Sequence, residues 1–87
     1  MDDGSQYKID FVVDARGLSC PMPLLKAKLA LNSLEVNQYL RMTATDLVSL
    51  QDIHSFVELT EHTLLSVDER EGEYTYIIMK GAQADYD

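Results

Sequence analysis

Both prolines of this chain stand in one tetrapeptide, Cys-Pro-Met-Pro at 20–23, directly before a run of leucines and alanines at helical spacing. Proline fixes the backbone φ near the helical value and lacks an N–H, so it suits the first turn of a helix. We therefore predict a helix with Pro21 as its first residue and Cys20 as its N-cap. Pro23 is expected in the same turn, so that the two prolines hold the cysteine sulfur at the positive end of the helix. The apolar stripe of this helix consists of Leu24, Ala27, Leu31 and Leu34, widened by Leu25 and Leu29.

The other segments predict four strands and a second helix. Short runs of β-branched and aromatic residues are typical of strands, and they occur at 9–13, 39–44, 64–67 and 74–79. The charged stretch 68–73 contains a glycine and predicts the loop of a hairpin between the last two strands. A second amphipathic stretch over about 47–60 follows Asp46, which is a good N-cap residue. We expect its inward face to consist of Leu47, Leu50, Ile53, Phe56 and Val57.

The order of these elements is β-α-β-α-β-β, which fits one arrangement in a chain of 87 residues. We predict an α/β fold, a two-layer sandwich with two helices on one face of a mixed four-stranded sheet. A right-handed crossover would join the first two strands in parallel. Residues 7–81 are expected to form a single domain, with flexible tails at 1–6 and 82–87.

Charge and cysteine content narrow the classes of partner. Seven basic residues stand against fifteen acidic ones, a net charge of −8. Such a chain repels phosphate backbones, so we expect no direct binding to nucleic acid. No stretch approaches the roughly 20 apolar residues of a membrane span, and the acidic, polar start differs from a signal peptide. With one cysteine the chain cannot form an internal disulfide, which gives no support to secretion, and we expect a cytoplasmic protein. We also expect a monomer without a membrane partner.

Cys20 is the strongest candidate for chemistry. The thiolate is the reactive form of cysteine, and a helix N-terminus lowers the pKa of a thiol. Gly17 lets the preceding loop bend, and Arg16 could add positive potential. A free cysteine elsewhere is more often a small buried hydrophobic residue. The proline-stiffened helix start favours an exposed and activated thiol at this position.

Other chemistries find little support. A Cys-x-x-Cys pair is absent, which excludes a self-contained dithiol oxidoreductase. His54 and His62 lie eight residues apart with no cysteine beside them, so we predict no metal site, and no cofactor is implied. We expect His54 on the exposed side of the second helix and His62 at the surface, at the start of a strand. Whether either histidine lies near Cys20 stays open.

Two segments resemble a known family. The pattern Asp14-x-x-Gly17-x-x-Cys20-Pro21-x-Pro23 after a first strand is similar to the signature of the TusA-like (SirA/YedF-type) sulfur carriers. The resemblance covers about 7–81 and implies the same β-α-β-α-β-β sandwich. It also implies that Cys20 accepts sulfane sulfur as a persulfide from a cysteine desulfurase or rhodanese. Working with such partner enzymes, the chain would pass this sulfur to an acceptor protein, for example in tRNA thiolation. The second half of the family pattern is matched by Asp46-x-x-Ser49-x-x-Asp52-Ile53, Phe56 and Lys80-Gly81.

This resemblance assigns roles around the cysteine. Cys20 is the persulfide-forming nucleophile, positioned by Pro21 and Pro23, with Gly17 and Asp14 shaping the loop. Some positions depart from the family pattern: many members have a basic residue where this chain has Ser19, a proline at position 54, and a glycine near 36–37. These departures bear on the choice of partner more than on the sulfur site. The residues expected to dock partners are Arg16, Ser19, Met22 and Lys26.

Two other functions remain open from the residues alone. Cys20 could serve a thiol-redox regulatory module that forms mixed disulfides. Alternatively, the domain could be an interaction module that binds through its open sheet face. A persulfide on Cys20 in protein isolated from cells would favour the carrier, and a glutathione adduct would favour the redox module.

Overall fold

The strands and helices follow one another in the predicted order in the computed structural model, which describes residues 7–82. The predicted tails at 1–6 and 82–87 lie outside the described residues, except for residue 82. No helix among residues 7–82 is long and apolar enough to cross a membrane. The elements are β1 (Ile9–Ala15), α1 (Met22–Ser33), β2 (Tyr39–Ala44), α2 (Val48–Glu58), β3 (Thr63–Arg70) and β4 (Glu73–Met79).

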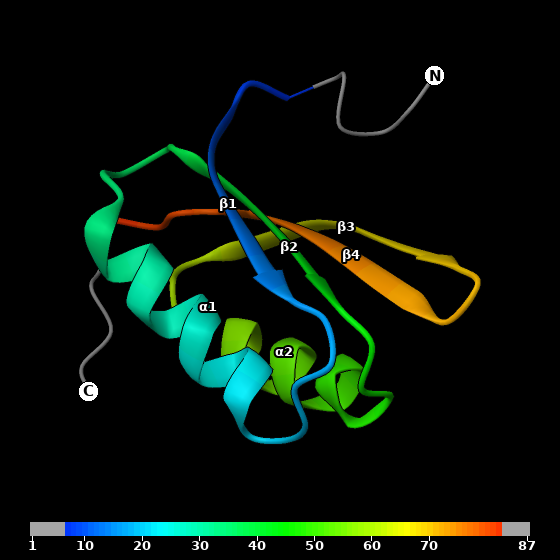
Figure 1. The fold of residues 1–87 in the computed structure, drawn as a ribbon. Coiled ribbons are helices and arrows are strands. Elements are labelled where there is room, and N and C mark those ends of the chain that lie inside the picture. Colours follow the sequence, from blue (N-terminus) through cyan, green and yellow to red (C-terminus); the bar gives the residue numbers. More distant parts are fainter. Residues whose placement is uncertain (1–6, 83–87) are drawn as a thin grey trace.

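The four strands form one mixed sheet with the order β1-β2-β4-β3. β1 and β2 pair in parallel, and the other two pairings are antiparallel. Both helices cover the same face of this sheet (Figure 1). The prediction of a two-layer α/β sandwich is therefore confirmed.

The core lies between the sheet and the helices. Alternate residues of the central strands point into it, as the period of two in a strand requires. On α1 the small residues Ala27 and Ala30 are buried beside Leu31, and on α2 Ile53 and Phe56 are buried. The predicted inward faces are thus confirmed at their centres and too wide at their margins: Leu25, Leu29 and Leu47 are exposed. These three side chains stand off the line of residues that meets the sheet.

The start of α1 differs from the prediction by one residue. α1 begins at Met22, and Pro21 is its N-cap, because the Pro21 carbonyl accepts the Leu25 N–H at 3.1 Å. Cys20 therefore lies one residue before the N-cap instead of occupying it, and Pro23 is the second helical residue. Such shifts of one residue are common at helix ends.

The hairpin between β3 and β4 is also tighter than predicted. β3 runs to Arg70 and β4 starts at Glu73, so only Glu71 and Gly72 form the turn. Both have positive φ, 52° and 82°, which is the backbone pattern of a two-residue hairpin whose twist matches its strands. The charged residues placed in a loop over 68–73 belong mostly to strands. The side chains at 69 and 70 are exposed, so their charges stay in contact with water and the strand pays no desolvation penalty for them.

His62 was predicted at the surface and is buried instead. Its Nδ1 accepts the backbone N–H of Gly81 at 2.9 Å, and its ring lies 5.7 Å from that of Phe56. This histidine therefore joins the start of β3 to the segment after β4. His54 is exposed on α2, as predicted.

Candidate functional site

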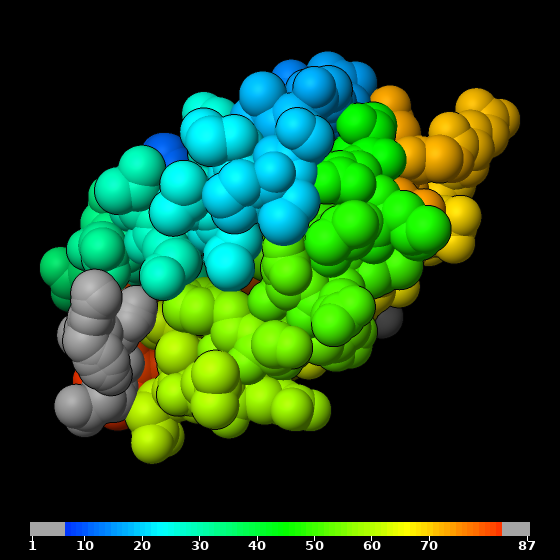
Figure 2. All heavy atoms as spheres, turned by 90° about the horizontal axis from the view of Figure 1, so that it is seen from below, coloured from blue at the N-terminus to red at the C-terminus, as the bar shows by residue number. Residues whose placement is uncertain are grey.

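Cys20 is exposed in the loop that connects β1 to α1. This loop lies beside the start of α2, so that the N-terminal ends of both helices meet at one end of the molecule (Figure 1). Seen from the helix side, the loop and the first turns of the two helices share one continuous surface (Figure 2). The thiol is thus open to a second protein, as the sequence predicted.

Asp52 of α2 is the direct partner of the thiol. Cys20 Sγ donates a hydrogen bond to Asp52 Oδ2 at 3.1 Å. This bond raises the pKa of the Cys20 thiol above its ordinary value, and partial desolvation and the negative charges of Asp52 and Asp46 act in the same direction. The predicted lowering of the Cys20 pKa is therefore wrong, because two carboxylates lie where the helix end alone would have favoured an anion.

Asp46 fixes the backbone at the same point. Its Oδ2 accepts the Cys20 N–H at 2.6 Å, and its Oδ1 accepts the Val48 N–H at 3.2 Å. One carboxylate therefore orients the cysteine and satisfies an otherwise unpaired N–H of the first turn of α2. The structure assigns the formal N-cap position to Leu47, one residue later than predicted, while the Asp46 side chain still supplies the capping bond.

Gly17 holds the loop ahead of the cysteine in a left-handed conformation with φ 82°. A Cβ at this position would meet nothing within 4 Å, so the backbone angle, and not space, calls for glycine. Its N–H donates to Thr45 Oγ1 at 2.9 Å, just before Asp46. The loop is thus tied twice to the segment that leads into α2.

Asp14 and Arg16 form a forked ion pair at the start of this loop. Asp14 Oδ1 accepts the Arg16 backbone N–H at 3.1 Å and Nε–H at 2.9 Å, and Oδ2 accepts Nη2–H at 3.1 Å. These bonds lower the pKa of Asp14 to about 2. The guanidinium of Arg16 also lies 3.6 Å from Glu73 at the start of the central strand β4, so it pairs with two acids of its own chain. A docking role for Arg16 stays a prediction.

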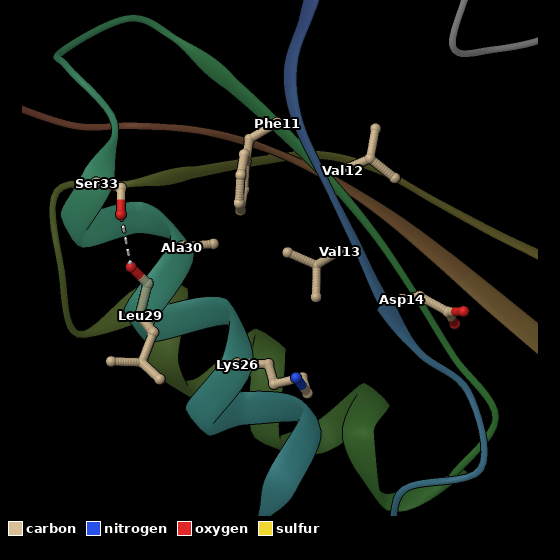
Figure 3. A pocket seen from close by; sticks show the side chains of 8 residues that line it. All are labelled: Phe11, Val12, Val13, Asp14, Lys26, Leu29, Ala30 and Ser33. Atoms are coloured by element: carbon tan, nitrogen blue, oxygen red, sulfur yellow. Dashed lines mark hydrogen bonds between the residues drawn. The ribbon is translucent and has the colours of Figure 1, made fainter.

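The other predicted docking residues, Ser19, Met22 and Lys26, are all exposed, but they lie at two different places. Ser19 and Met22 lie beside Cys20, where Leu47 and Val48 of the α2 start are also exposed. Lys26 instead lines a groove of about 360 Å³ between β1 and α1. Figure 3 shows Phe11 and Val13 directed into this groove, with Val12 turned away. The other lining residues are Asp14, Leu29, Ala30 and Ser33.

Sequence reasoning missed the part that α2 plays in the site. Asp46, Ser49 and Asp52 are spaced three residues apart, which places them along one side of the helix start. The outer two hold Cys20, while the Ser49 hydroxyl is buried and bonds to the Tyr76 hydroxyl at 2.6 Å. The signal was present as the matched pattern Asp-x-x-Ser-x-x-Asp, but its partners lie 26 to 32 residues away along the chain.

Residues 7–82 contain no cluster of three or more histidine, cysteine or acidic side chains that could hold a metal ion. Cys20 is the only cysteine in the sequence, and its thiol is the one strong nucleophile at this surface. The arrangement can therefore form one covalent bond at sulfur, with Asp52 hydrogen-bonded to the thiol and Asp46 bonded to the backbone N–H of the same residue. Fold and site together define a small α/β domain that presents a single thiol to other proteins.

Comparison with known proteins identifies the class. Residues 11–80 match the family described as sulfurtransferase TusA. The sulfur carrier protein TusA of Allochromatium vinosum is 38% identical over 71 residues, which cover 82% of this chain and 93% of that protein. The crystal structure of a SirA-like protein from Desulfitobacterium hafniense superimposes with a TM-score of 0.73 at 25% identity, covering 83% of this chain and 99% of that one. The chain belongs to the TusA family, and it is a sulfur carrier that interacts with sulfur donor and acceptor proteins.

Proposed function

We propose that Cys20 carries sulfane sulfur as a persulfide, loaded by a cysteine desulfurase or a rhodanese and delivered to an acceptor protein. The observation that supports this most directly is the exposure of the only cysteine, at the surface where both helices begin. Transfer requires two sulfur atoms to come into contact, and a thiol in an open loop permits this. Without a second cysteine in the chain, no internal thiol can remove the sulfur before delivery.

Loading is an exchange at sulfur without net oxidation. The Cys20 thiolate attacks the outer sulfur of the donor's persulfide, R–S–SH, and forms a new S–S bond. The old S–S bond breaks, and its electron pair stays on the donor sulfur, which takes the proton that Cys20 gave up. The products are R–SH and Cys20–S–SH, and delivery to an acceptor thiol repeats the exchange in the other direction.

The charge of the chain bears on the acceptor. A net charge of −8 opposes contact with an RNA backbone, so delivery to a protein is favoured even where the sulfur ends in tRNA. A free thiol is maintained in a reducing compartment, which supports a cytoplasmic site of action.

Mass spectrometry tests the proposal directly. The chain is incubated with a cysteine desulfurase and cysteine, or with a rhodanese and thiosulfate, and its intact mass is measured before and after addition of a reductant. We expect a gain of one sulfur atom that the reductant reverses, and no gain for Cys20→Ser. If neither donor class adds sulfur to the wild-type chain, the proposal is wrong. A glutathione adduct as the only modification in protein isolated from cells would favour a redox regulatory module instead.

A further inference from the structure

Among residues 7–82, the charged groups that act on Cys20 are both acids. Asp52 on α2 and Asp46 just before α2 are the charged groups whose fields act on Cys20 Sγ. In the part of the chain that the structure describes, neither carboxylate has a cationic partner. The ion pairs of that part are Arg16 with Asp14 and Glu73, and Arg70 with Asp68.

This geometry favours the thiol over the thiolate. The Asp52 carboxylate can accept a hydrogen bond from Cys20 only while the sulfur keeps its proton. Once the proton leaves, two negative groups about 3 Å apart repel each other. The nucleophile needed for sulfur transfer is the thiolate. The free chain therefore stabilises the thiol, which is the less reactive form. A transfer partner has to supply the interaction that shifts the balance to the thiolate.

We propose that the surface formed by Cys20, Asp46 and Asp52 docks a cationic side chain of the sulfur-transfer partner, which pairs with Asp52 and thereby releases the Cys20 thiolate. The inference rests on the proposed function and specifies how the partner is recognised. An arginine suits the position well, because its guanidinium can bind a carboxylate with two parallel hydrogen bonds. The same cation stabilises the neighbouring thiolate, since an opposite charge within about 4–6 Å favours the ionised form.

The apolar surroundings strengthen this interaction. Three large hydrophobic residues near this surface are exposed: Leu47 and Val48, which follow Asp46, and Met22, two residues after Cys20. Covering them on docking excludes water, and a charge pair is stronger when it is less hydrated. The charge pattern selects among occupants: a second copy of this chain would bring its own net charge of −8 and the same acids to the contact. A protein that presents a basic residue next to its reactive cysteine is the partner that fits.

Reagents that differ in charge probe the surface without any sulfur donor. The probes are a cationic (trimethylammonium) and an anionic (sulfonate) methanethiosulfonate of similar size, applied to the folded full chain. Their rate ratio is measured relative to the ratio for N-acetylcysteine amide, a neutral thiol. We expect the cationic reagent to be favoured by about tenfold, because Asp52 is hydrogen-bonded to the sulfur and Asp46 to the backbone N–H of the same residue. This preference should shrink as salt is added, because ions screen exposed charges.

Asp52→Asn is the informative variant, because it keeps the shape and a hydrogen-bond acceptor and removes the charge. We expect it to lose most of the cationic preference and to shift the pH midpoint of alkylation by neutral iodoacetamide to lower pH. The matched control is Glu58→Gln, which removes one exposed acid from the far end of the same helix and should leave both readouts unchanged. A loss of structure would affect both reagents alike and would not move the ratio in a charge-dependent way.

The outcomes separate the two proposals. A cationic preference that is equal in the wild type and in Asp52→Asn, or a pH midpoint that Asp52→Asn does not lower, overturns this inference and leaves the sulfur-loading assay untouched. Failure of the wild type to load sulfur, with the charge preference present, overturns the proposed function and not the acidic recognition surface.

Discussion

The two ends of the helical layer differ in the side chains that bond to the backbone groups left unpaired at helix ends. Helix ends leave backbone groups without partners, and each end needs side chains to satisfy them. Where the helices start, the half-buried carboxylates of Asp46 and Asp52 bind the Cys20 loop and the first turn of α2. Where α1 ends, the buried ammonium of Lys80 donates to the carbonyl of Leu31.

The second end is closed by further bonds. The Lys80 backbone exchanges hydrogen bonds with the turn before β2, through Asn37 N–H at 2.9 Å and the Gln38 carbonyl at 2.8 Å. Gly81 follows, buried, and donates its N–H to His62. Polar groups here are matched inside the molecule and serve stability. At the other end the acids keep part of their surface exposed, and this is what makes that end available to a partner.

The largest effect should come from adding a single methyl group at the closed end. A Cβ on Gly81 would lie 2.1 Å from the backbone oxygen of Glu61. Gly81→Ala therefore has to push the backbone at Gly81 away from the backbone at Glu61. We expect a loss of about 3 kcal/mol in the free energy of unfolding, the upper range for overpacking. Urea unfolding followed by circular dichroism measures it.

Gly17→Ala is the matched variant at the open end. Nothing lies within 4 Å of its Cβ, but its φ of 82° costs a side chain about 1–2 kcal/mol. The comparison between the ends fails if Gly17→Ala destabilises the chain as much as Gly81→Ala does.

An effect no larger than that of Gly81→Ala is expected from Lys80→Met, which keeps the length of the buried side chain and removes its donor. Leu31 O still accepts the Leu34 N–H at 3.1 Å, so the carbonyl retains one partner. We expect a loss of about 1–3 kcal/mol, typical of removing one member of a buried hydrogen bond to a charged group. Lys26→Met makes the same change at an exposed site on α1 and should stay within about 0.5 kcal/mol of the wild type. Equal thermal stabilities of the two variants would show that the Lys80 bond contributes nothing.

Much of this fold follows from local pattern. The period of apolar residues predicted each helix and strand, and the two prolines placed a helix start directly after Cys20. Local pattern could not give the pKa direction at Cys20, since Asp46 and Asp52 reach the cysteine across 26 and 32 residues. The burial of His62 was missed for the same reason, because its partner Gly81 lies 19 residues further along the chain.

The smallest expected effect concerns the paired acid of the open end. Asp14 differs from Asp46 and Asp52 in having a cation, and its bonds to Arg16 lower its pKa to about 2. A carboxyl whose pKa is lower in the folded chain stabilises the fold above its ordinary pKa, near 3.8, and loses this contribution as the pH falls toward 2. An NMR titration of the Asp14 carboxyl should show the low midpoint, and Arg16→Ala should raise it toward the ordinary value. Arg70→Ala removes an arginine that pairs instead with Asp68, and it should leave the Asp14 midpoint in place. An Asp14 midpoint near 3.8 in the wild type would mean that the forked pair does not persist in solution, and that no acid at this end is neutralised from within the chain.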